Sequence, residues 1–154
     1  MKKLFYLLFL APFCLMTSCK DDDDFAPFDL TLTVSGVTTS GNGFYTVPGE
    51  ELTLENMKVV GIDGNTTGVS NVVYYLDGAP WPLVPGVENP FTISTDQLPL
   101  GKHSIGITGN LLQENYSIKN FAANFSVTVV ESTDELPLGA PAIGTYSQTI
   151  SFSN

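Results

Sequence analysis

The segment FAANFSVTV, residues 121–129, carries the clearest structural pattern of this chain. Its apolar residues stand at every second position from Phe121 onward, and Asn124, Ser126 and Thr128 alternate with them. A period of two is typical of a β-strand that buries one face and exposes the other to water. The segment FDLTLTVS, residues 28–35, shows the same alternation without interruption. These two segments predict an all-β protein.

Several further segments between these two have the composition of strands. They are ELTLENMKVVGI (51–62), VSNVVYYL (69–76), residues 91–95 and residues 103–112. Turn signals such as Asp63-Gly64-Asn65 and Asp77-Gly78 separate them, and no window shows a helical period with caps. About seven short strands over residues 28–131 predict an antiparallel β-sandwich, with a closed barrel as the alternative.

Three stretches within this region resemble a known kind of module. VVYYLDG (72–78), PFTISTDQLPLGKHSIGITG (90–109) and FSVTVVE (125–131) resemble the bacterial immunoglobulin-like modules of surface lipoproteins. The corner pattern of those modules falls on Asp96, Leu98, Gly101, His103, Ile105 and Ile107. The resemblance implies an immunoglobulin-like β-sandwich. It implies little about activity, because this fold hosts many unrelated functions.

The first residues of the chain have the features of an export signal. Lys2 and Lys3 are followed by a short apolar run, residues 4–16, which is too short to cross a bilayer as a helix. The small residues Thr17 and Ser18 then lead into Cys19. This arrangement resembles the lipobox of bacterial lipoproteins, which implies that residues 1–18 are a signal peptide. Cys19 would then carry the acyl chains, palmitate among them; an ordinary secretory peptide is the alternative.

An acidic segment follows the predicted lipidation site. Lys20, Asp21, Asp22, Asp23 and Asp24 resemble the export signal of surface-exposed lipoproteins of Bacteroidota. The resemblance implies an outer-membrane location facing the cell exterior, with residues 19–27 as an extended tether. The alternative is a charge run that only keeps the tether solvated.

The end of the chain predicts a linker followed by one more strand. Residues 132–142 are rich in Pro and Gly, and residues 143–152 place Tyr146, Ile150 and Phe152 on one face. We therefore separate residues 132–154 from the sandwich. Whether the last strand docks on the sandwich or hangs free remains open.

Composition excludes several classes of function. The formal charge is −10, and removal of Lys2 and Lys3 with residues 1–18 takes it to −12. The chain contains no arginine, so binding to phosphate backbones or base edges is not expected. After Cys19 there is no further cysteine, so we expect no disulfide, no thiol catalysis and no cysteine metal site.

The sequence offers no recognisable catalytic set, and we expect neither an enzyme nor a cofactor. His103 is the only histidine, and it shares a strand face with Ile105 and Ile107, which favours a structural role with its ring bonded to nearby backbone. The carboxylates Glu50, Glu51, Asp63, Asp77, Glu88 and Asp96 lie at a strand start, in turns and in a loop. A calcium site at Asp63, Asn65 and Asp77 is the weaker alternative to isolated turn residues, and we expect no metal.

Two aromatic residues are the candidates for contact with a ligand or partner. Trp81 lies in the proline-rich loop APWPLVP, which stiffens its surroundings and lowers the entropy lost on binding. The alternative is that Trp81 covers one end of the core. Tyr74 and Tyr75 point to opposite faces of one strand, so we expect one in the core and Tyr75 exposed.

Together these features predict a lipid-anchored lipoprotein of the outer membrane. Its expected role is that of a non-catalytic binding or accessory module for a glycan or another envelope protein, held to the membrane through Cys19. The alternative is a structural subunit whose segment 143–152 completes the sheet of a neighbour.

Overall fold

The computed structural model describes residues 24–80 and 91–153 of the chain. In these ranges it contains nine β-strands and two 3-10 helices, and no helix long and apolar enough to cross a bilayer. The strands are β1 (Phe28–Ser40), β2 (Gly43–Thr46), β3 (Glu51–Gly61), β4 (Thr67–Leu76), β5 (Ala79–Pro80), β6 (Phe91–Ser94), β7 (Gly101–Gln113), β8 (Lys119–Val129) and β9 (Gly144–Phe152). The helices are η2 (Thr95–Gln97) and η3 (Thr133–Glu135). The prediction of an all-β protein is confirmed.

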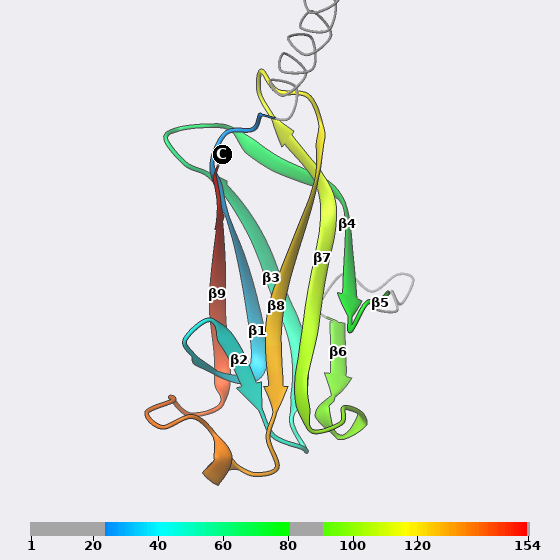
Figure 1. Cartoon of the computed structure of the whole chain (residues 1–154), viewed down its shortest axis with the longest axis vertical. Helices are drawn as coiled ribbons and strands as arrows, with labels where there is room; N and C mark the ends of the chain where they lie inside the picture. The colour runs from blue at the N-terminus through cyan, green and yellow to red at the C-terminus, as the bar shows by residue number, and fades with distance from the viewer. Residues whose placement is uncertain (1–23, 81–90, 154) are drawn as a thin grey trace, which may run out of the picture.

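The strands form one curled sheet with the order β5-β4-β7-β8-β2-β1-β3-β6, and β9 pairs with β1 (Figure 1). Within the described ranges the path is open, because it ends at β5 on one side and at β6 on the other. Every pair is antiparallel except β2 with β8, so the prediction of a purely antiparallel sheet is wrong at this point. No strand was predicted between residues 35 and 51, so β2 and its parallel pairing were missed.

The curled sheet has two halves: one contains β3, β6 and β9, and the other contains β2, β4, β5, β7 and β8. Strand β1 belongs to both. Residues 28–35 pair with β3 and β9, and Val37 still pairs with β9, whereas residues 38–40 pair with β2. Between them Gly36 has a φ of +78°, and a Cβ atom there would lie 2.1 Å from the carbonyl oxygen of Glu51. Only glycine fits both the backbone conformation and the available space. Gly36 therefore allows β1 to pass from one half to the other.

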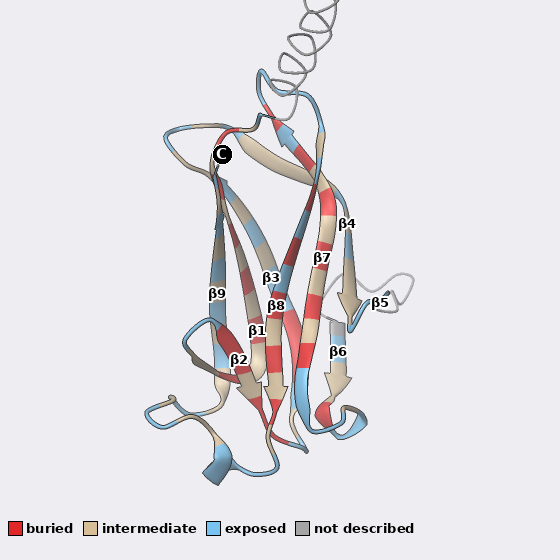
Figure 2. Ribbon diagram, in the orientation of Figure 1, coloured by how far each residue is buried: buried red, intermediate tan, exposed pale blue. Residues whose placement is uncertain are grey.

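The two halves pack face to face around one hydrophobic core. Alternate residues of β1, β7 and β8 are buried, as the red bands in Figure 2 show. Phe28 of β1 meets Phe121 of β8 edge to face, with ring centroids 6.4 Å apart. Each such large side chain contributes about 1.5–3 kcal/mol when it is fully buried. The alternation of both quoted segments thus predicted the core positions correctly.

The structure answers the open question about the C-terminal segment, because β9 docks along β1. The pairing runs from Phe28 opposite Phe152 to Val37 opposite Gly144. Tyr146, Ile150 and Phe152 pack against the core. On the outer face, hydroxyl pairs link the two strands: Thr31 with Thr149 at 2.8 Å, Thr33 with Ser147 at 2.7 Å, and Ser35 with Thr145 at 3.0 Å.

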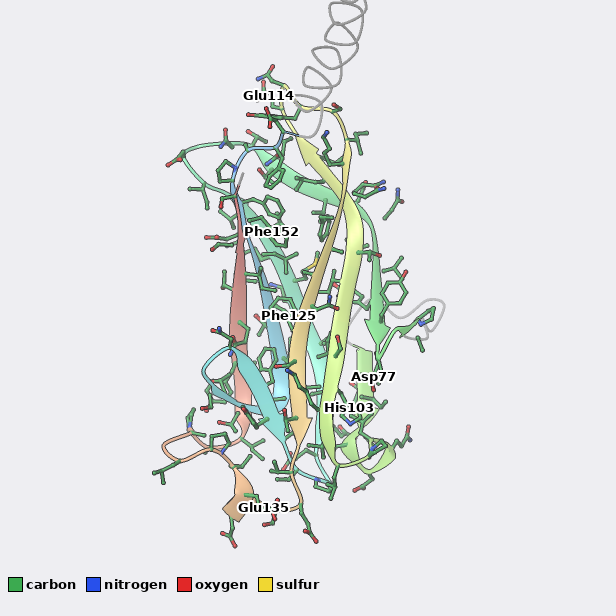
Figure 3. All side chains as sticks on the ribbon, viewed as in Figure 1. Asp77, His103, Glu114, Phe125, Glu135 and Phe152 are labelled. Atoms are coloured by element: carbon green, nitrogen blue, oxygen red, sulfur yellow. The ribbon has the colours of Figure 1, made fainter. Side chains whose placement is uncertain are left out.

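The elongated sheet has two ends that carry different loops. The N-terminal residues 24–27, the β3–β4 connection (62–66) and the β7–β8 turn (114–118) lie at one end, which we call the tether end. The turn 77–78, residues 95–100 and the β8–β9 connection (130–143) lie toward the other, the far end. Figure 3 shows the separation, with Glu114 at the tether end and Glu135 at the far end.

Candidate functional site

Several residues singled out in the sequence lie outside the described ranges. These are the predicted lipidation site Cys19, the residues Lys20, Asp21, Asp22 and Asp23 of the acidic segment, Glu88, and Trp81. Asp24, the first described residue, is exposed.

His103 and Asp77 form a hydrogen-bonded pair toward the far end (Figure 3). The Nδ1 atom of His103 lies 2.6 Å from Oδ2 of Asp77, and its Nε2 atom lies 2.7 Å from the carbonyl oxygen of Pro99. The second carboxylate oxygen of Asp77 accepts a bond of 2.8 Å from the backbone N–H of Ser104. The pair therefore ties the β4–β5 turn to the start of β7.

The surroundings of this pair favour its charged form. Burial works against the charge on His103, but the hydrogen bonds to Asp77 and Pro99 and the nearby carboxylate raise its pKa above the ordinary value. Burial likewise opposes the charge on Asp77, yet the bonds from His103 and Ser104 hold its pKa below the ordinary value. In the charged form, both ring nitrogens of His103 donate to fixed acceptors. A ring in this state has no free lone pair with which to accept a proton from a substrate.

The expected backbone bond of the His103 ring is confirmed, and the bond to Asp77 was missed. Asp77 was predicted only as a turn residue, and its backbone does adopt the left-handed conformation, with a φ of +50°. The missing information was the register of β4 on β7, which pairs Leu76 with Ile105 and so brings Asp77 beside Ser104. This register pairs segments about 30 to 45 residues apart, so no short sequence motif predicts it.

The residues considered for calcium are not brought together. Asp63 and Asn65 precede β4 at the tether end, and Asp77 follows it toward the far end. A strand of ten residues separates the two groups by about 30 Å. The side chain of Asn65 instead donates to the carbonyl of Ile62 at 2.6 Å, as expected for a turn residue. Within the described ranges no three His, Cys, Asp or Glu side chains gather in a way that suits a metal ion.

Tyr74 and Tyr75 point to opposite faces of β4, as expected. Tyr74 packs against the core, and burial raises the pKa of its phenol. Tyr75 is half-buried on the outer face, where it is paired across the strands with Gly106 of β7. Gly106 is in turn paired with Asn124 of β8. Tyr75, Gly106 and Asn124 therefore form one row across three strands.

Gly106 makes room for the tyrosine ring in this row. A Cβ atom at position 106 would lie 3.4 Å from Cβ of Tyr75 and 3.2 Å from Oδ1 of Asn124. Larger residues at this position would therefore meet both neighbours. Because Gly106 has no side chain, the surface between the ring of Tyr75 and the amide of Asn124 stays recessed.

The row lies within a longer depression on the outer face of β4, β7 and β8. A hollow of about 600 Å³ at the far end shares Ser104 and Asn124 with a neighbouring hollow of about 270 Å³. The second hollow shares Thr108 and Ala122 with a third of about 440 Å³. We call the whole the polar trough. Its lining residues are Asn42, Tyr75, Asp77, Lys102, Ser104, Gly106, Thr108, Asn110, Asn120, Ala122, Asn124 and Ser126, together with Gly78, His103, Gly109 and the core residues Ile107, Phe121, Ala123 and Phe125.

The polar trough presents neutral hydrogen-bonding groups beside one aromatic ring. Amides and hydroxyls both donate and accept, so its asparagine, serine and threonine side chains suit a ligand rich in hydroxyl groups. The negative charge of Asp77 is matched by His103, and Lys102 is exposed at the same hollow. In a chain with a formal charge of −10, this surface therefore carries no excess of negative charge.

Sequence reasoning named Tyr75 but missed the rest of the polar trough. The signal was present as small and polar residues at alternate positions of β7 and β8, opposite the core positions. An outer face of small residues is usual for a solvated strand, so the pattern alone did not distinguish a trough from an ordinary surface.

The chain matches no protein family model, no curated protein and no solved structure.

Proposed function

We propose that this chain is a lipoprotein anchored in the outer membrane through Cys19 and exposed at the cell surface. Its sheet would be an immunoglobulin-like, non-catalytic binding module that takes an extended glycan along the polar trough. The observation that carries the ligand class is the row of Tyr75, Gly106 and Asn124.

The strand order supports an immunoglobulin-like arrangement. Strands β4, β7 and β8 lie in the order of the C, F and G strands of that fold, and β1, β3 and β6 in the order of A, B and E. The passage of β1 between the halves and the parallel pairing of β2 with β8 fit a first strand that changes sheets. The docked β9 is an addition to this pattern.

The position of the N-terminal residues supports an anchored module. The chain joins the sheet at the tether end, so an anchor at Cys19 would direct the far end away from the membrane. The polar trough runs along the side of the sheet and stays accessible in this orientation. Residues 20–24 would act as the spacer, since four consecutive carboxylates repel one another and keep a segment extended.

A glycan suits the polar trough for two reasons. The apolar C–H face of a sugar ring packs on an aromatic ring such as Tyr75, and sugar hydroxyls bond to amides such as Asn124. An open trough along β7 and β8 also accommodates a linear chain without a deep pocket. The end of β5, Pro80, is paired with Tyr75, and Trp81 is the next residue in the sequence but lies outside the described ranges.

Binding to an array of extended oligosaccharides tests the proposal, with the detergent-solubilised mature protein as the probe. We expect Tyr75→Ala and Asn124→Ala each to weaken binding by about tenfold, the loss expected for a central contact. Tyr116→Ala is the matched control, because Tyr116 is an exposed tyrosine at the tether end. Failure of the intact protein to bind any glycan would contradict the glycan proposal. Co-purification of an envelope protein that is lost in Tyr75→Ala would assign the polar trough to a protein partner instead.

The second candidate function is that of an assembly subunit, and the docking of β9 on β1 is the observation that favours it. In the structure β9 completes the sheet of its own chain. Exchange of β9 with another copy would present the same pairing between chains. Concentration-dependent oligomers that disappear on truncation after Glu131 would support this role, and a monomer at all concentrations would contradict it.

A further inference from the structure

Exposed large apolar side chains occur toward both ends of the sheet, and those of Leu112, Tyr116 and Ile118 lie close together in the sequence at the tether end. The turn between β7 and β8, residues 114–118, is exposed along its whole length, and we call it the tip. Within the tip Ile118 is 66% exposed and Tyr116 is 41% exposed. Leu112, on the strand leading to it, is 37% exposed. A turn normally presents polar residues to water, so these side chains require an explanation.

The start of the described chain is fixed beside the tip. The backbone N–H of Ala26 donates to Oε1 of Gln113 at 3.0 Å, and Nε2 of Gln113 donates to the carbonyl of Ala26 at 2.7 Å. Ala26 is 2% exposed and Gln113 is 9% exposed, so these two bonds are shielded from water. Gln113 is the residue directly before the tip. The chain therefore enters the sheet beside the tip.

The number of residues before this point limits how far the tip can be from an anchor. Cys19 precedes Ala26 by seven residues. Even when fully extended, seven residues span at most about 25 Å. If this extended segment lies along the membrane surface and does not stand upright on it, the tip reaches the lipid headgroups.

We propose that the tip is a second membrane contact, in which Tyr116 and Ile118 enter the boundary between headgroups and acyl chains. This inference rests on the proposed lipidation of Cys19. The anchor makes the contact intramolecular, so two apolar side chains suffice where a free domain would not bind. Tyrosine suits this depth, because its ring is apolar and its hydroxyl stays hydrated.

The charges near the tip indicate which surface it contacts. Glu114 belongs to the tip, Lys119 directly follows it, and Asp24 precedes the bonded Ala26 by two residues, so these three charges sum to −1. Carboxylates gain nothing from an anionic surface, so the contact is apolar and the lipid surface need not be charged. We expect insertion into uncharged phosphatidylcholine bilayers that does not change with salt concentration.

A single introduced thiol tests the proposal in the mature lipoprotein. The chain has no cysteine after Cys19, whose thiol would carry lipid, so Ile118→Cys offers one labelling site. A polarity-sensitive fluorophore at position 118 is expected to shift to the blue in phosphatidylcholine vesicles and to be quenched by spin-labelled lipid. Leu138→Cys is the matched control, because Leu138 is fully exposed in the β8–β9 connection toward the far end. The label at position 138 should show neither change.

The same experiment separates failure of the contact from failure of the anchor. Protein that floats with the vesicles while labels at positions 118 and 138 give the same spectrum would overturn the tip contact alone. Protein that does not float, with an unmodified Cys19 by mass spectrometry, would overturn both the anchor and the contact. A labelled Tyr116→Ser, Ile118→Cys double variant should show a smaller blue shift, because the tip then enters the bilayer less deeply.

Discussion

The imidazole of His103 is held by the carboxylate of Asp77 at 2.6 Å and by the carbonyl of Pro99 at 2.7 Å. His103 is 8% exposed, whereas the side chain of Asp77 is 48% exposed. The pair is thus a charged contact at the boundary between the core and the polar trough. It supports the wall of the trough and gives the fold a dependence on pH.

The stability of the protein should decrease as the pH rises above about 6.5, the unfolded pKa of histidine. The folded pKa of His103 is raised above its unfolded value of about 6.5, so its stabilisation is complete below that pH and is lost as the pH rises through the folded pKa. The pKa of Asp77 is lowered, so its stabilisation is present above about pH 4 and is lost as the pH falls through the folded value. Urea unfolding between about pH 3 and 9 should show a maximum between these limits.

Asp77→Asn is the variant that tests the origin of this pH dependence. Asparagine tolerates the left-handed backbone of position 77, so the turn should be retained. We expect a loss of about 1 kcal/mol in the free energy of unfolding near pH 6, reduced by solvent screening at the half-exposed carboxylate. In this variant the free energy of unfolding should decrease less steeply as the pH rises above about 6.5. An unchanged slope in Asp77→Asn would show that another group causes it.

Thr95→Val should be strongly destabilising although it keeps the size of the side chain. The buried hydroxyl of Thr95 lies 2.8 Å from the carbonyl of Val47 and accepts a bond of 3.0 Å from the N–H of Glu50. Its loss leaves buried backbone groups unpaired, at a cost of about 2–3 kcal/mol. Thr95→Ser keeps the hydroxyl and is the matched control, with a cost of about 1 kcal/mol for the lost methyl group. Equal unfolding midpoints of the two variants would contradict the role of the hydroxyl.

Gly36→Ala should prevent β1 from passing between the two halves. The new Cβ atom would lie 2.1 Å from a backbone oxygen of Glu51, which cannot move without shifting β3. We expect a loss of about 3 kcal/mol or more, or failure to fold. Gly41→Ala also has a positive φ, +58°, but nothing lies within 4 Å of the new atom, so it should cost only about 1–2 kcal/mol. Circular dichroism during urea unfolding measures the difference, and equal costs would show that the close approach is unimportant.

Phe152→Ala should weaken the docking of β9. The ring of Phe152 stacks on Phe28, with centroids 4.6 Å apart and planes 5° from parallel. Because Phe152 is only partly buried, we expect a loss of about 2 kcal/mol. Thr149→Ala, on the outer face of the same strand, should change stability by less than about 1 kcal/mol. Amide exchange along β9 should accelerate in the first variant and stay unchanged in the second.

The sequence alone predicted the class of the fold and many of its core positions. Strict alternation fixes which side chains face inward, so residues such as Phe28 and Phe125 were assigned to buried faces from the pattern alone. Alternation does not determine which strand is the neighbour of which. The docking of β9, the parallel pairing of β2 and the bond between Asp77 and His103 all depend on contacts between distant segments, and none of them was predicted.

The candidate site was predicted only in part for the same reason. Tyr75 was named as a contact residue because adjacent residues of a strand point to opposite faces, so one of Tyr74 and Tyr75 had to lie on the outer face. Its neighbours Gly106 and Asn124 come from β7 and β8, and only the register of those strands brings the three residues into one row. The predicted contact residue Trp81 lies outside the described residues.

The pairing of Phe28 with Phe152 joins residues 124 positions apart in the sequence (152 minus 28). A polypeptide that emerges from a ribosome or a translocation channel with its N-terminus first therefore presents β1 long before residues 144–152 are available to cover it. Contacts of such long range slow folding, and an uncovered strand edge can pair with other chains. Nascent chains that stop before residue 144 should consequently be prone to aggregation. Only a fully synthesised chain can cover the edge of β1.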